Sequence, residues 1–359
     1  MAERLADHTT LRLGGPAREW VRATTEDQVL DAVRTADDRG TPVLVLGGGS
    51  NLVVADAGFD GLVVQVATRG VSSDLDDVDE PGAACGGVLV EVAAGEVWDD
   101  VVAEAVARGW AGVEALAGIP GSTGATPIQN VGAYGQEVAQ TIARVRCYDR
   151  VERRVRTLAA SECEFGYRHS RFKAEAGRFV VLQVVFQLRV GSLSYPVAYA
   201  ELARALGVEV GGRAPLADVR DAVLALRRGK GMVLDPADHD TWSAGSFFTN
   251  PVVPSDVVPA GAPRWPVVTD GADGLVKTSA AWLIEHAGFG KGHGGSAVAL
   301  SGKHTLALTN RGVATTGDLL ALAAEVRDGV HRVFGITLVP EPVLLGCALP
   351  PVPGAAPAT

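Results

Sequence analysis

The sequence predicts a globular fold that mixes helices and strands in two or three domains. The chain has 359 residues and is 47% hydrophobic, which is enough to build more than one core. Segments with helical spacing of apolar residues and short apolar runs typical of strands both recur along it. Two glycine-rich segments, residues 43–51 and 118–135, interrupt these patterns. Because the second suits neither a helix nor a core strand, we expect a binding site there.

The charge of the chain argues against nucleic acid as its main partner. The net charge is −10, and charges of both signs are mixed along most of the sequence, whereas phosphate backbones require a basic face. An anionic small molecule stays compatible, since it needs only a few local cations. No apolar run reaches membrane-spanning length, and the first fifteen residues show no signal-peptide pattern. We therefore expect a cytoplasmic protein that binds neither nucleic acid nor membrane.

The cysteines and histidines predict no metal site. No cysteine belongs to a CxxC pair, so we expect reduced, buried thiols at Cys85, Cys147, Cys163 and Cys347. His286 and His293 could be taken for metal ligands, but their spacing matches no zinc pattern and no CxxC or HExxH supports them.

The N-terminal half predicts helices and strands in alternation. A helix is expected over residues 25–39, because Thr25 precedes acidic residues and Val29 and Val33 recur at helical spacing. A second amphipathic helix is expected over residues 98–108. Short apolar runs predict strands over residues 42–46, 52–55, 61–66, 88–94 and 179–190, and a hairpin over 144–149 and 153–158.

A change of composition at residues 191–200 predicts a domain boundary. Beyond it, helices are expected over residues 199–206, 216–228, 278–287 and 316–334, and a strand over residues 337–345. The last ten residues, PPVPGAAPAT, are of low complexity, and we expect them to be disordered.

The two glycine-rich segments contain no basic residue, which favours a ligand pyrophosphate held by backbone dipoles. The GGGSN loop at residues 47–51 lacks the Lys-Ser/Thr ending of a P-loop, so triphosphate hydrolysis is not expected. GKGHGG at residues 290–295 fits the GxGxxG pattern, but a helix-like segment precedes it, so we interpret it as a loop with positive φ. Without a nicotinamide fingerprint, a flavin is the better hypothesis.

Three residues are candidates for a catalytic role. From the sequence motifs alone, each allows a structural and a functional interpretation. Arg168, in CEFGYRHSRFK, belongs either to a solvated cationic turn or to a clamp for a carboxylate. Ser246, in SAGSFFTNP, is either a turn serine or a reactive hydroxyl. Glu341 stands between two prolines in an apolar stretch, either at a strand edge facing water or in a site that uses its charge.

In their order along the chain, these motifs resemble those of the UDP-N-acetylenolpyruvoylglucosamine reductase family. The resemblance covers residues 8–346 and rests on HTTLRLGGPA, VLGGGSN, GIPGSTGATPIQNVGAYG, CEFGYRHSRFK, AGSFFTNP, KTSAAWLIEHAG and LVPEPVLLG. It implies an α+β fold: a PCMH-type, vanillyl-alcohol-oxidase-like FAD-binding domain of two subdomains and a smaller α+β C-terminal substrate-binding domain. The expected boundaries are residues 1–70 and 71–195 for the FAD-binding subdomains, 196–349 for the substrate domain and 350–359 for the tail.

The resemblance also implies an activity. It is the reduction of UDP-N-acetylglucosamine enolpyruvate to UDP-N-acetylmuramate in peptidoglycan precursor synthesis, and thus in cell wall biogenesis, cell shape and cell division. FAD would be bound non-covalently, and NADPH would be the co-substrate that reduces it. Hydride would pass from FAD N5 to C3 of the enolpyruvyl group and a proton would reach C2. We expect a monomer.

Motif by motif, the resemblance assigns Ser246 as proton donor, Arg168 as the group that holds the substrate carboxylate, and Glu341 as the group that polarises it. FAD would be held by Gly47, Gly48, Gly49, Ser50, Asn51, Gly121, Ser122, Gly124, Ala125, Gln129, Asn130, Gly132, Ala133 and Gly135. The nucleotide sugar would be bound by Tyr134, Tyr199, Arg227, Lys230, Asn250 and Lys277. Tyr199 resembles the tyrosine of the substrate-covering loop in one subgroup, which is the subgroup we expect. His293 and Gly294 depart from the larger aromatic and basic residues that the family often has there.

Two other functions stay open at this point. Another flavoenzyme of the same superfamily, acting on a sugar or hydroxy acid, would usually hold FAD covalently through His or Cys, and neither glycine-rich segment contains one. A non-catalytic protein that binds nucleotide sugars would keep Arg227, Lys230 and Asn250 but would need neither Ser246 nor Glu341. Reduction of a bound flavin by NADPH would distinguish these functions.

Overall fold

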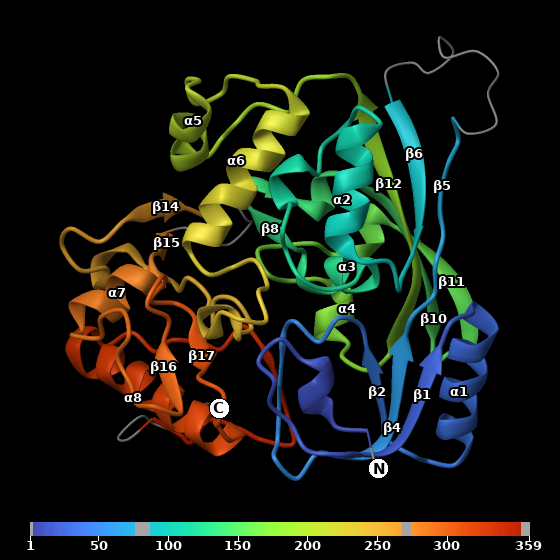
Figure 1. Ribbon diagram of the computed structural model, residues 1–359, viewed down its shortest axis with the longest axis horizontal. Coiled ribbons are helices and arrows are strands. Elements are labelled where there is room, and N and C mark those ends of the chain that lie inside the picture. Colours follow the sequence, from blue (N-terminus) through green and yellow to red (C-terminus); the bar gives the residue numbers. More distant parts are fainter. Residues whose placement is uncertain (1–2, 76–86, 268–273, 353–359) are drawn as a thin grey trace. The chain divides into compact units, whose positions relative to one another are not determined.

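The computed structural model describes residues 3–75, 87–267 and 274–352, which fold into two compact units. Each unit gathers segments that are far apart in the sequence (Figure 1). Unit 1 comprises Met1–Pro16, Gly49–Phe59 and Leu234–Thr359, and unit 2 comprises Ala17–Gly48 and Asp60–Val233. The chain therefore passes from unit 2 into unit 1 inside the GGGSN loop.

The expected division into functional domains, with boundaries at residues 70, 195 and 349, stays a prediction. Residues 353–359 of the expected tail lie outside the described residues, as does Cys85.

Unit 2 contains two main sheets. The smaller has the order β1–β4–β2, in which β2 is parallel to β4, and helix α1 packs against β1 and β2. These elements are β1 Ala17–Ala23, α1 Glu26–Asp38, β2 Val43–Leu46 and β4 Phe59–Val66. The larger sheet has the order β11–β10–β12–β6–β5, and β7 also pairs with β12. Its strands are β5 Val71–Ser73, β6 Gly87–Ala93, β7 Trp110–Ala111, β10 Ile142–Asp149, β11 Arg154–Ala159 and β12 Phe179–Val190.

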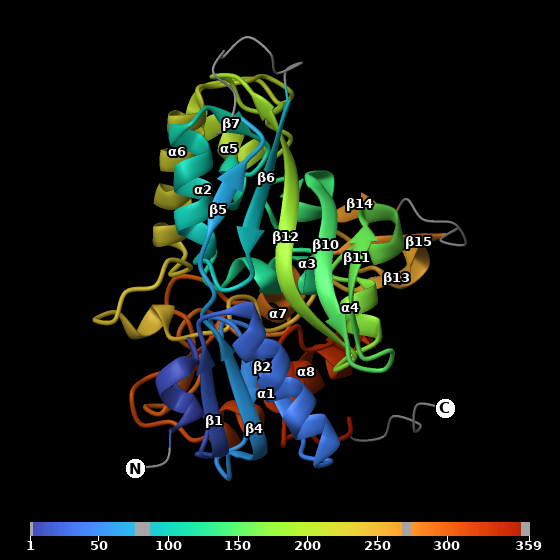
Figure 2. The same ribbon diagram turned by 90° about the vertical axis from the view of Figure 1, so that its right-hand side faces the viewer.

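Local patterns predicted most of these elements. Figure 2 shows the long strand β12 between β6 and β10, and both of these pairings are antiparallel. The predicted hairpin of β10 and β11 is confirmed, as is the cap of α1, where Thr25 accepts a hydrogen bond from the Gln28 amide. Strand β1 was missed, because the charged residues in AREWVRA conceal a strand pattern.

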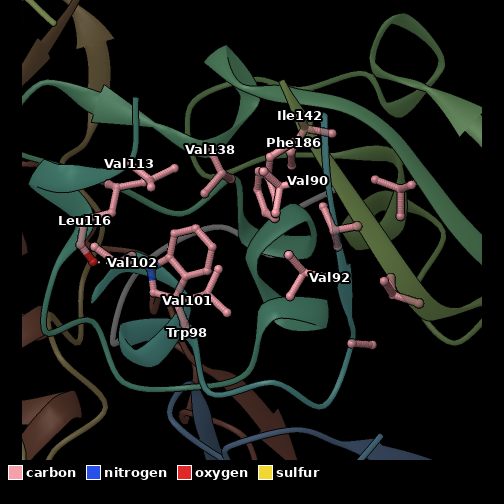
Figure 3. Close-up of a cluster of buried hydrophobic side chains, with 14 of the residues drawn as sticks. Val90, Val92, Trp98, Val101, Val102, Val113, Leu116, Val138, Ile142 and Phe186 are labelled. Atoms are coloured by element: carbon pink, nitrogen blue, oxygen red, sulfur yellow. Dashed lines mark hydrogen bonds between the residues drawn. The ribbon is translucent and has the colours of Figure 1, made fainter. Parts of the chain in front are cut away.

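Helix α2 (Trp98–Ala107) fills the core of unit 2 against the larger sheet (Figure 3). Trp98 is 1% exposed, and its ring centroid lies 5.6 Å from that of Phe186 on β12. The indole Nε1 of Trp98 donates a hydrogen bond of 3.2 Å to the Leu116 carbonyl. This bond fixes the chain immediately before the second glycine-rich segment. Truncation of such a buried ring costs about 3–5 kcal/mol.

The second glycine-rich segment contains a 3-10 turn over Thr123–Ala125 and a short α-helix directly after it, so the prediction that it avoids helical structure is wrong there. Pro127 stands in the first turn of that helix, where a missing N–H leaves no intrahelical bond broken. The remaining elements of unit 2 are α3 Thr126–Gln129, β8 Gly132–Ala133, β9 Gln136–Glu137, α4 Arg171–Ala174, α5 Ala200–Leu206 and α6 Leu216–Gly229.

Unit 1 has its own apolar core, in which α7 packs against α8. Helix α8 begins at Thr316, and Thr315, its N-cap, forms a capping box with Asp318. The helices are α7 Ala280–His286 and α8 Thr316–Phe334. The strands are β3 Leu52–Val54, β13 Val252–Pro254, β14 Arg264–Pro266, β15 Leu275–Thr278, β16 Val298–Leu300, β17 Leu308–Asn310 and β18 Val343–Leu345.

The strand expected over residues 337–345 is wrong for most of its length. Only β18, Val343–Leu345, is a strand, and it pairs in parallel with β3. Pro340 and Pro342 have no N–H to donate to a ladder, so before β18 this segment forms only an isolated bridge, between Pro340 and Phe248. The pairing with β3 brings the C-terminal segment to the residues that follow the GGGSN loop.

Three cysteines lie in the described ranges, and all three are free thiols. Burial raises the pKa of Cys147 to about 11 and that of Cys163 to about 12, which makes both thiols inert at neutral pH. Among the helices of those ranges, none combines the length and apolarity that a membrane span requires.

Candidate active site

The two glycine-rich segments meet inside unit 2. A Cβ added to Gly47 would lie 2.2 Å from Ser122 Oγ, and one added to Gly48 would lie 2.6 Å from Gly121 Cα. These distances leave no room for a side chain, so the close approach of the two backbones requires glycine. The structure therefore brings together two loops that the sequence predicts to share one ligand.

The last part of the GGGSN loop presents unused backbone donors. Gly49 has a φ of 59°, and a Cβ there would lie 1.9 Å from the His8 carbonyl oxygen. Among the described residues, no protein acceptor receives a hydrogen bond from the amides of Gly48, Gly49 and Ser50. Gly49 is buried, and buried backbone N–H groups normally have partners, so these donors suit an anionic ligand. The loop therefore fits the pyrophosphate of a dinucleotide such as FAD.

Some amides of the second segment are already used, so the backbone-cradle hypothesis is wrong for them. The Gly124 amide donates to the Ala94 carbonyl at 2.8 Å, and the Ala125 amide donates to Ser122 at 3.0 Å. Gly124 has a packing reason to be glycine, because a Cβ would lie 2.6 Å from Ala94 Cβ. That Gly124 and Ala125 contact the cofactor stays a prediction.

Arg168 fastens the end of the second glycine-rich segment. Its Nη2 donates to the Gly132 carbonyl at 2.9 Å, and its Nη1 donates to the Asn130 carbonyl at 3.4 Å. Its Cζ lies 5.7 Å from the ring centroid of Tyr167. The half-buried guanidinium is thus fixed in place, which favours the clamp reading over a solvated turn.

Backbone strain gathers in this part of unit 2. Asn130, Tyr134 and Arg168 have φ values of 43°, 48° and 51°, in the left-handed region that non-glycine residues rarely adopt. Strain of this kind costs roughly 1–3 kcal/mol for each residue and persists mainly where function requires the conformation. All three residues are among those that the sequence predicts for the site.

A cluster of aromatic and cationic side chains forms next to this segment. The rings of Tyr134 and Tyr199 meet edge to face at 5.5 Å, and Lys230 Nζ lies 5.5 Å from the Tyr134 ring centroid. Burial raises the pKa of Tyr134, so its phenol is a neutral donor. Burial lowers the pKa of Arg227 to about 10, which leaves the guanidinium charged at neutral pH. The structure therefore brings together these four predicted substrate residues.

Sequence analysis missed one member of this cluster, Glu201. Its Oε2 lies 2.6 Å from Lys230 Nζ. Glu201 lies in the first turn of α5, two residues after Tyr199, and this position in the sequence could have indicated its role.

In unit 1, Glu341 contacts Phe247, the residue that follows Ser246. The Glu341 amide donates a hydrogen bond of 2.8 Å to the carbonyl of Phe247, and Asn51 Nδ2 donates to the Glu341 carbonyl at 3.5 Å. The Val343 amide in turn donates to the Asn51 carbonyl at 3.0 Å. Glu341 is half-buried and lies just before β18 rather than in it. Its backbone therefore links residues 243–251, here called the serine loop, to the GGGSN loop.

Thr10 makes a second link that sequence analysis missed. Its Oγ1 donates to the Ser243 carbonyl at 2.6 Å, and its amide donates to the Gly49 carbonyl at 3.2 Å. Nearby, Arg12 Cζ lies 3.7 Å from the ring centroid of Trp242. The HTTLRLGGPA motif therefore has a structural role, because Thr10 and Arg12 contact Ser243 and Trp242 at the N-terminal end of the serine loop.

Asn250 and Lys277 are the remaining predicted substrate residues, and both lie in unit 1. Asn250 Oδ1 accepts a hydrogen bond of 3.0 Å from the Ala280 amide at the start of α7. Lys277 lies on β15, opposite Val252 and Trp265. Their contacts with a substrate stay predictions.

The GKGHGG loop is not part of a dinucleotide fold. It follows helix α7, and Gly292 and Gly294 have φ values of 78° and 131°, which confirms its interpretation as a loop with positive φ. His293 Nε2 lies 2.9 Å from Glu325 Oε1, so this departure from the family pattern makes a local contact within unit 1.

Comparison with known proteins identifies the family. The FAD binding domain family matches residues 17–157, and the family of the UDP-N-acetylenolpyruvoylglucosamine reductase C-terminal domain matches residues 235–345. The UDP-N-acetylenolpyruvoylglucosamine reductase of Cutibacterium acnes is 59% identical over 348 residues, with 96% of this chain and 90% of that one covered. This chain belongs to the UDP-N-acetylenolpyruvoylglucosamine reductase family.

Further relatives agree with this assignment. The UDP-N-acetylenolpyruvoylglucosamine reductase of Streptomyces coelicolor is 58% identical over 355 residues, with 96% of this chain and 90% of that one covered. The crystal structure of the Thermus caldophilus reductase superposes with a TM-score of 0.64 at 25% identity, covering 96% of this chain and 99% of that one. The predicted α+β class, with an FAD-binding domain followed by the C-terminal domain of this reductase family, is confirmed.

Proposed function

We propose that this chain is an NADPH-dependent FAD enzyme that reduces UDP-N-acetylglucosamine enolpyruvate to UDP-N-acetylmuramate in peptidoglycan precursor synthesis. Family membership over 96% of the chain carries this conclusion. We further infer that the enzyme acts as a cytoplasmic monomer and that its product serves cell wall biogenesis, cell shape and cell division.

The backbone donors of the GGGSN loop support non-covalent FAD. Gly48, Gly49 and Ser50 would hold its pyrophosphate, while Gly47 keeps the loop against Ser122. When bound, the flavin would supply the hydride transfer between NADPH and the enolpyruvyl group. The protein's own residues must then bind the substrate carboxylate, stabilise the charge that develops there and deliver a proton to C2.

Arg168 is the residue that we assign to the carboxylate. Hydride addition at C3 spreads negative charge from C2 into that carboxylate, and a fixed guanidinium stabilises it without reorganisation. The bonds from Arg168 to the carbonyls of Gly132 and Asn130 support this role, because they fix the guanidinium before substrate arrives.

Ser246 is the residue that we assign to proton transfer. Its hydroxyl would donate a proton to C2, which breaks the O–H bond and forms the C2–H bond, and the resulting alkoxide would take up a proton from water. Glu341 is assigned to polarising the substrate carboxylate. The hydrogen bond from its amide to the Phe247 carbonyl supports a fixed position of Glu341 relative to the serine loop.

The nucleotide part of the substrate is assigned to the cluster around Tyr134. Arg227 and Lys230 would bind the diphosphate, the Tyr134 phenol would donate to it, and Tyr199 would cover it. Asn250 and Lys277 are assigned to the sugar. We infer that NADPH and the UDP-sugar use Arg227 and Lys230 in turn.

The test follows the visible absorption of the purified protein anaerobically while NADPH and then UDP-N-acetylglucosamine enolpyruvate are added. We expect a flavin band that bleaches with NADPH and returns with the sugar. A band that bleaches but does not return would contradict the substrate and favour another flavoenzyme of the superfamily. A colourless protein that cannot be reconstituted with FAD would overturn the assignment of both glycine-rich segments.

A further inference from the structure

Lys230, whose ammonium group is assigned to the diphosphate, already pairs with a carboxylate of the protein. Glu201 Oε2 lies 2.6 Å from Lys230 Nζ, and the two side chains are 35% and 32% exposed. Glu201 lies in the first turn of α5, and Lys230 is the C-cap of α6. Figure 1 shows these helices beside each other within unit 2. Glu201 therefore occupies the ammonium group that is assigned to the diphosphate.

The charges around Tyr134 show how Glu201 affects an incoming anion. The charged groups that act on the Tyr134 phenol are Lys230, Arg227 and Glu201. Loss of the Glu201 charge would remove the carboxylate that opposes Lys230 and Arg227 at this phenol. A diphosphate bound to Lys230 either replaces Glu201 as its partner or lies beside it against like-charge repulsion.

We propose that Glu201 is an internal counter-ion of the diphosphate site, which occupies Lys230 in the empty enzyme and is displaced by the diphosphate of each ligand. This inference rests on the proposed function, in which two diphosphate ligands use the site in turn. The first ligand must leave before the second enters. Because Glu201 competes with the diphosphate for Lys230, it weakens the binding of both ligands and raises their dissociation rates.

The test compares two single substitutions in the FAD-loaded enzyme. Glu201→Gln removes the charge and keeps the size of the side chain. Glu209→Gln is the matched control, because it removes the same charge from an exposed glutamate just after α5. We expect calorimetry to show about three- to fivefold tighter binding of UDP to Glu201→Gln, in line with a partly exposed ion pair. Stopped-flow release of NADP⁺ should slow by a similar factor, and Glu209→Gln should change neither value.

A Lys230→Ala background separates this inference from the proposed function. Lys230→Ala should weaken UDP and NADPH together, and loss of only one would contradict the shared site whatever Glu201 does. Adding Glu201→Gln to Lys230→Ala should have no further effect, because Glu201 acts through Lys230. An unchanged or weaker UDP affinity in Glu201→Gln would overturn the proposal, as would an equal gain with and without Lys230.

Discussion

The backbone amide of Glu341 donates a hydrogen bond of 2.8 Å to the carbonyl of Phe247, the residue that follows Ser246. Asn51 also donates to the Glu341 carbonyl. One backbone segment therefore sets the place of the predicted proton donor and touches the loop that supplies unused amides for the cofactor.

Substitution of Ser246 by Ala should separate the two half-reactions. Flavin reduction by NADPH should stay intact, because it needs no proton from Ser246. Flavin reoxidation by the enolpyruvyl substrate should slow by at least about 100-fold, the usual contribution of a positioned acid. Stopped-flow absorption measures both steps. Ser243→Ala is the control, and equal slowing of both steps in Ser246→Ala would contradict the proton-donor assignment.

Substitution of Thr10 by Val should weaken the brace of the serine loop. The Thr10 hydroxyl bonds to the Ser243 carbonyl at 2.6 Å, and its loss leaves that carbonyl without this donor. We expect the free energy of unfolding to fall by about 1–2 kcal/mol and flavin reoxidation to slow more than flavin reduction. Urea unfolding and stopped-flow absorption test these effects. Thr10→Ser keeps the hydroxyl, so equal behaviour of the Ser and Val variants would contradict the assigned role.

Substitution of Gly48 by Ala should reduce flavin retention. The new Cβ would lie 2.6 Å from Gly121 Cα, so one of the two loops must move. We expect less FAD per chain after gel filtration, measured by absorption, whatever the catalytic rate. Gly191→Ala is the matched control, since a Cβ there meets nothing within 4 Å. A Gly48→Ala protein that retains as much flavin as Gly191→Ala would show that the contact of the loops is dispensable.

Asp149 should make unit 2 sensitive to acid. Its side chain is fully buried, and Arg178 Nη2 donates to it at 2.7 Å. Hydrogen bonds from Arg178 lower its pKa from the ordinary 3.8 to about 2, and those from the Val151 and Glu152 amides act in the same direction. Because the folded pKa is depressed, the carboxylate stabilises the fold above about pH 4, and this contribution is lost as the pH falls towards 2.

The substitution Asp149→Asn tests this prediction, because it removes the carboxylate charge and keeps the size of the side chain. At neutral pH it should cost about 1.5–3 kcal/mol, since Arg178 and the Val151 and Glu152 amides lose a charged acceptor while Arg178 keeps its bond to Glu175. Urea unfolding from pH 7 to pH 3 measures the difference between the two proteins, which isolates Asp149 from the other carboxylates. That difference should shrink below about pH 4. A difference that stays constant over this range would contradict the depressed pKa.

Much of the fold followed from local patterns. Helix α8 matches its predicted bounds because Thr315 caps it and its apolar spacing is regular. Strand β12 also matches, because a long apolar run fills the middle of a sheet. The expected strand over residues 337–345 was mostly wrong, since apolar composition outweighed the two prolines in that prediction.

The residues of the candidate site were also only partly predictable from the sequence. Motif order alone pointed to Arg168, Ser246 and Glu341, and composition alone pointed to the two glycine-rich segments. Neither Thr10 nor Glu201 was found, because each acts through a partner that is distant in the sequence.

The sequence by itself determined the helices and strands with strong periodicity, the glycine-rich loops and the family. Only the tertiary structure decided that Gly48 lies against Gly121, that Thr10 bonds to Ser243 and that Glu201 pairs with Lys230. The physical reason is the range of the interactions. Capping and periodicity depend on residues within a few positions of each other, whereas these three contacts depend on every backbone angle of the chain that separates the partners.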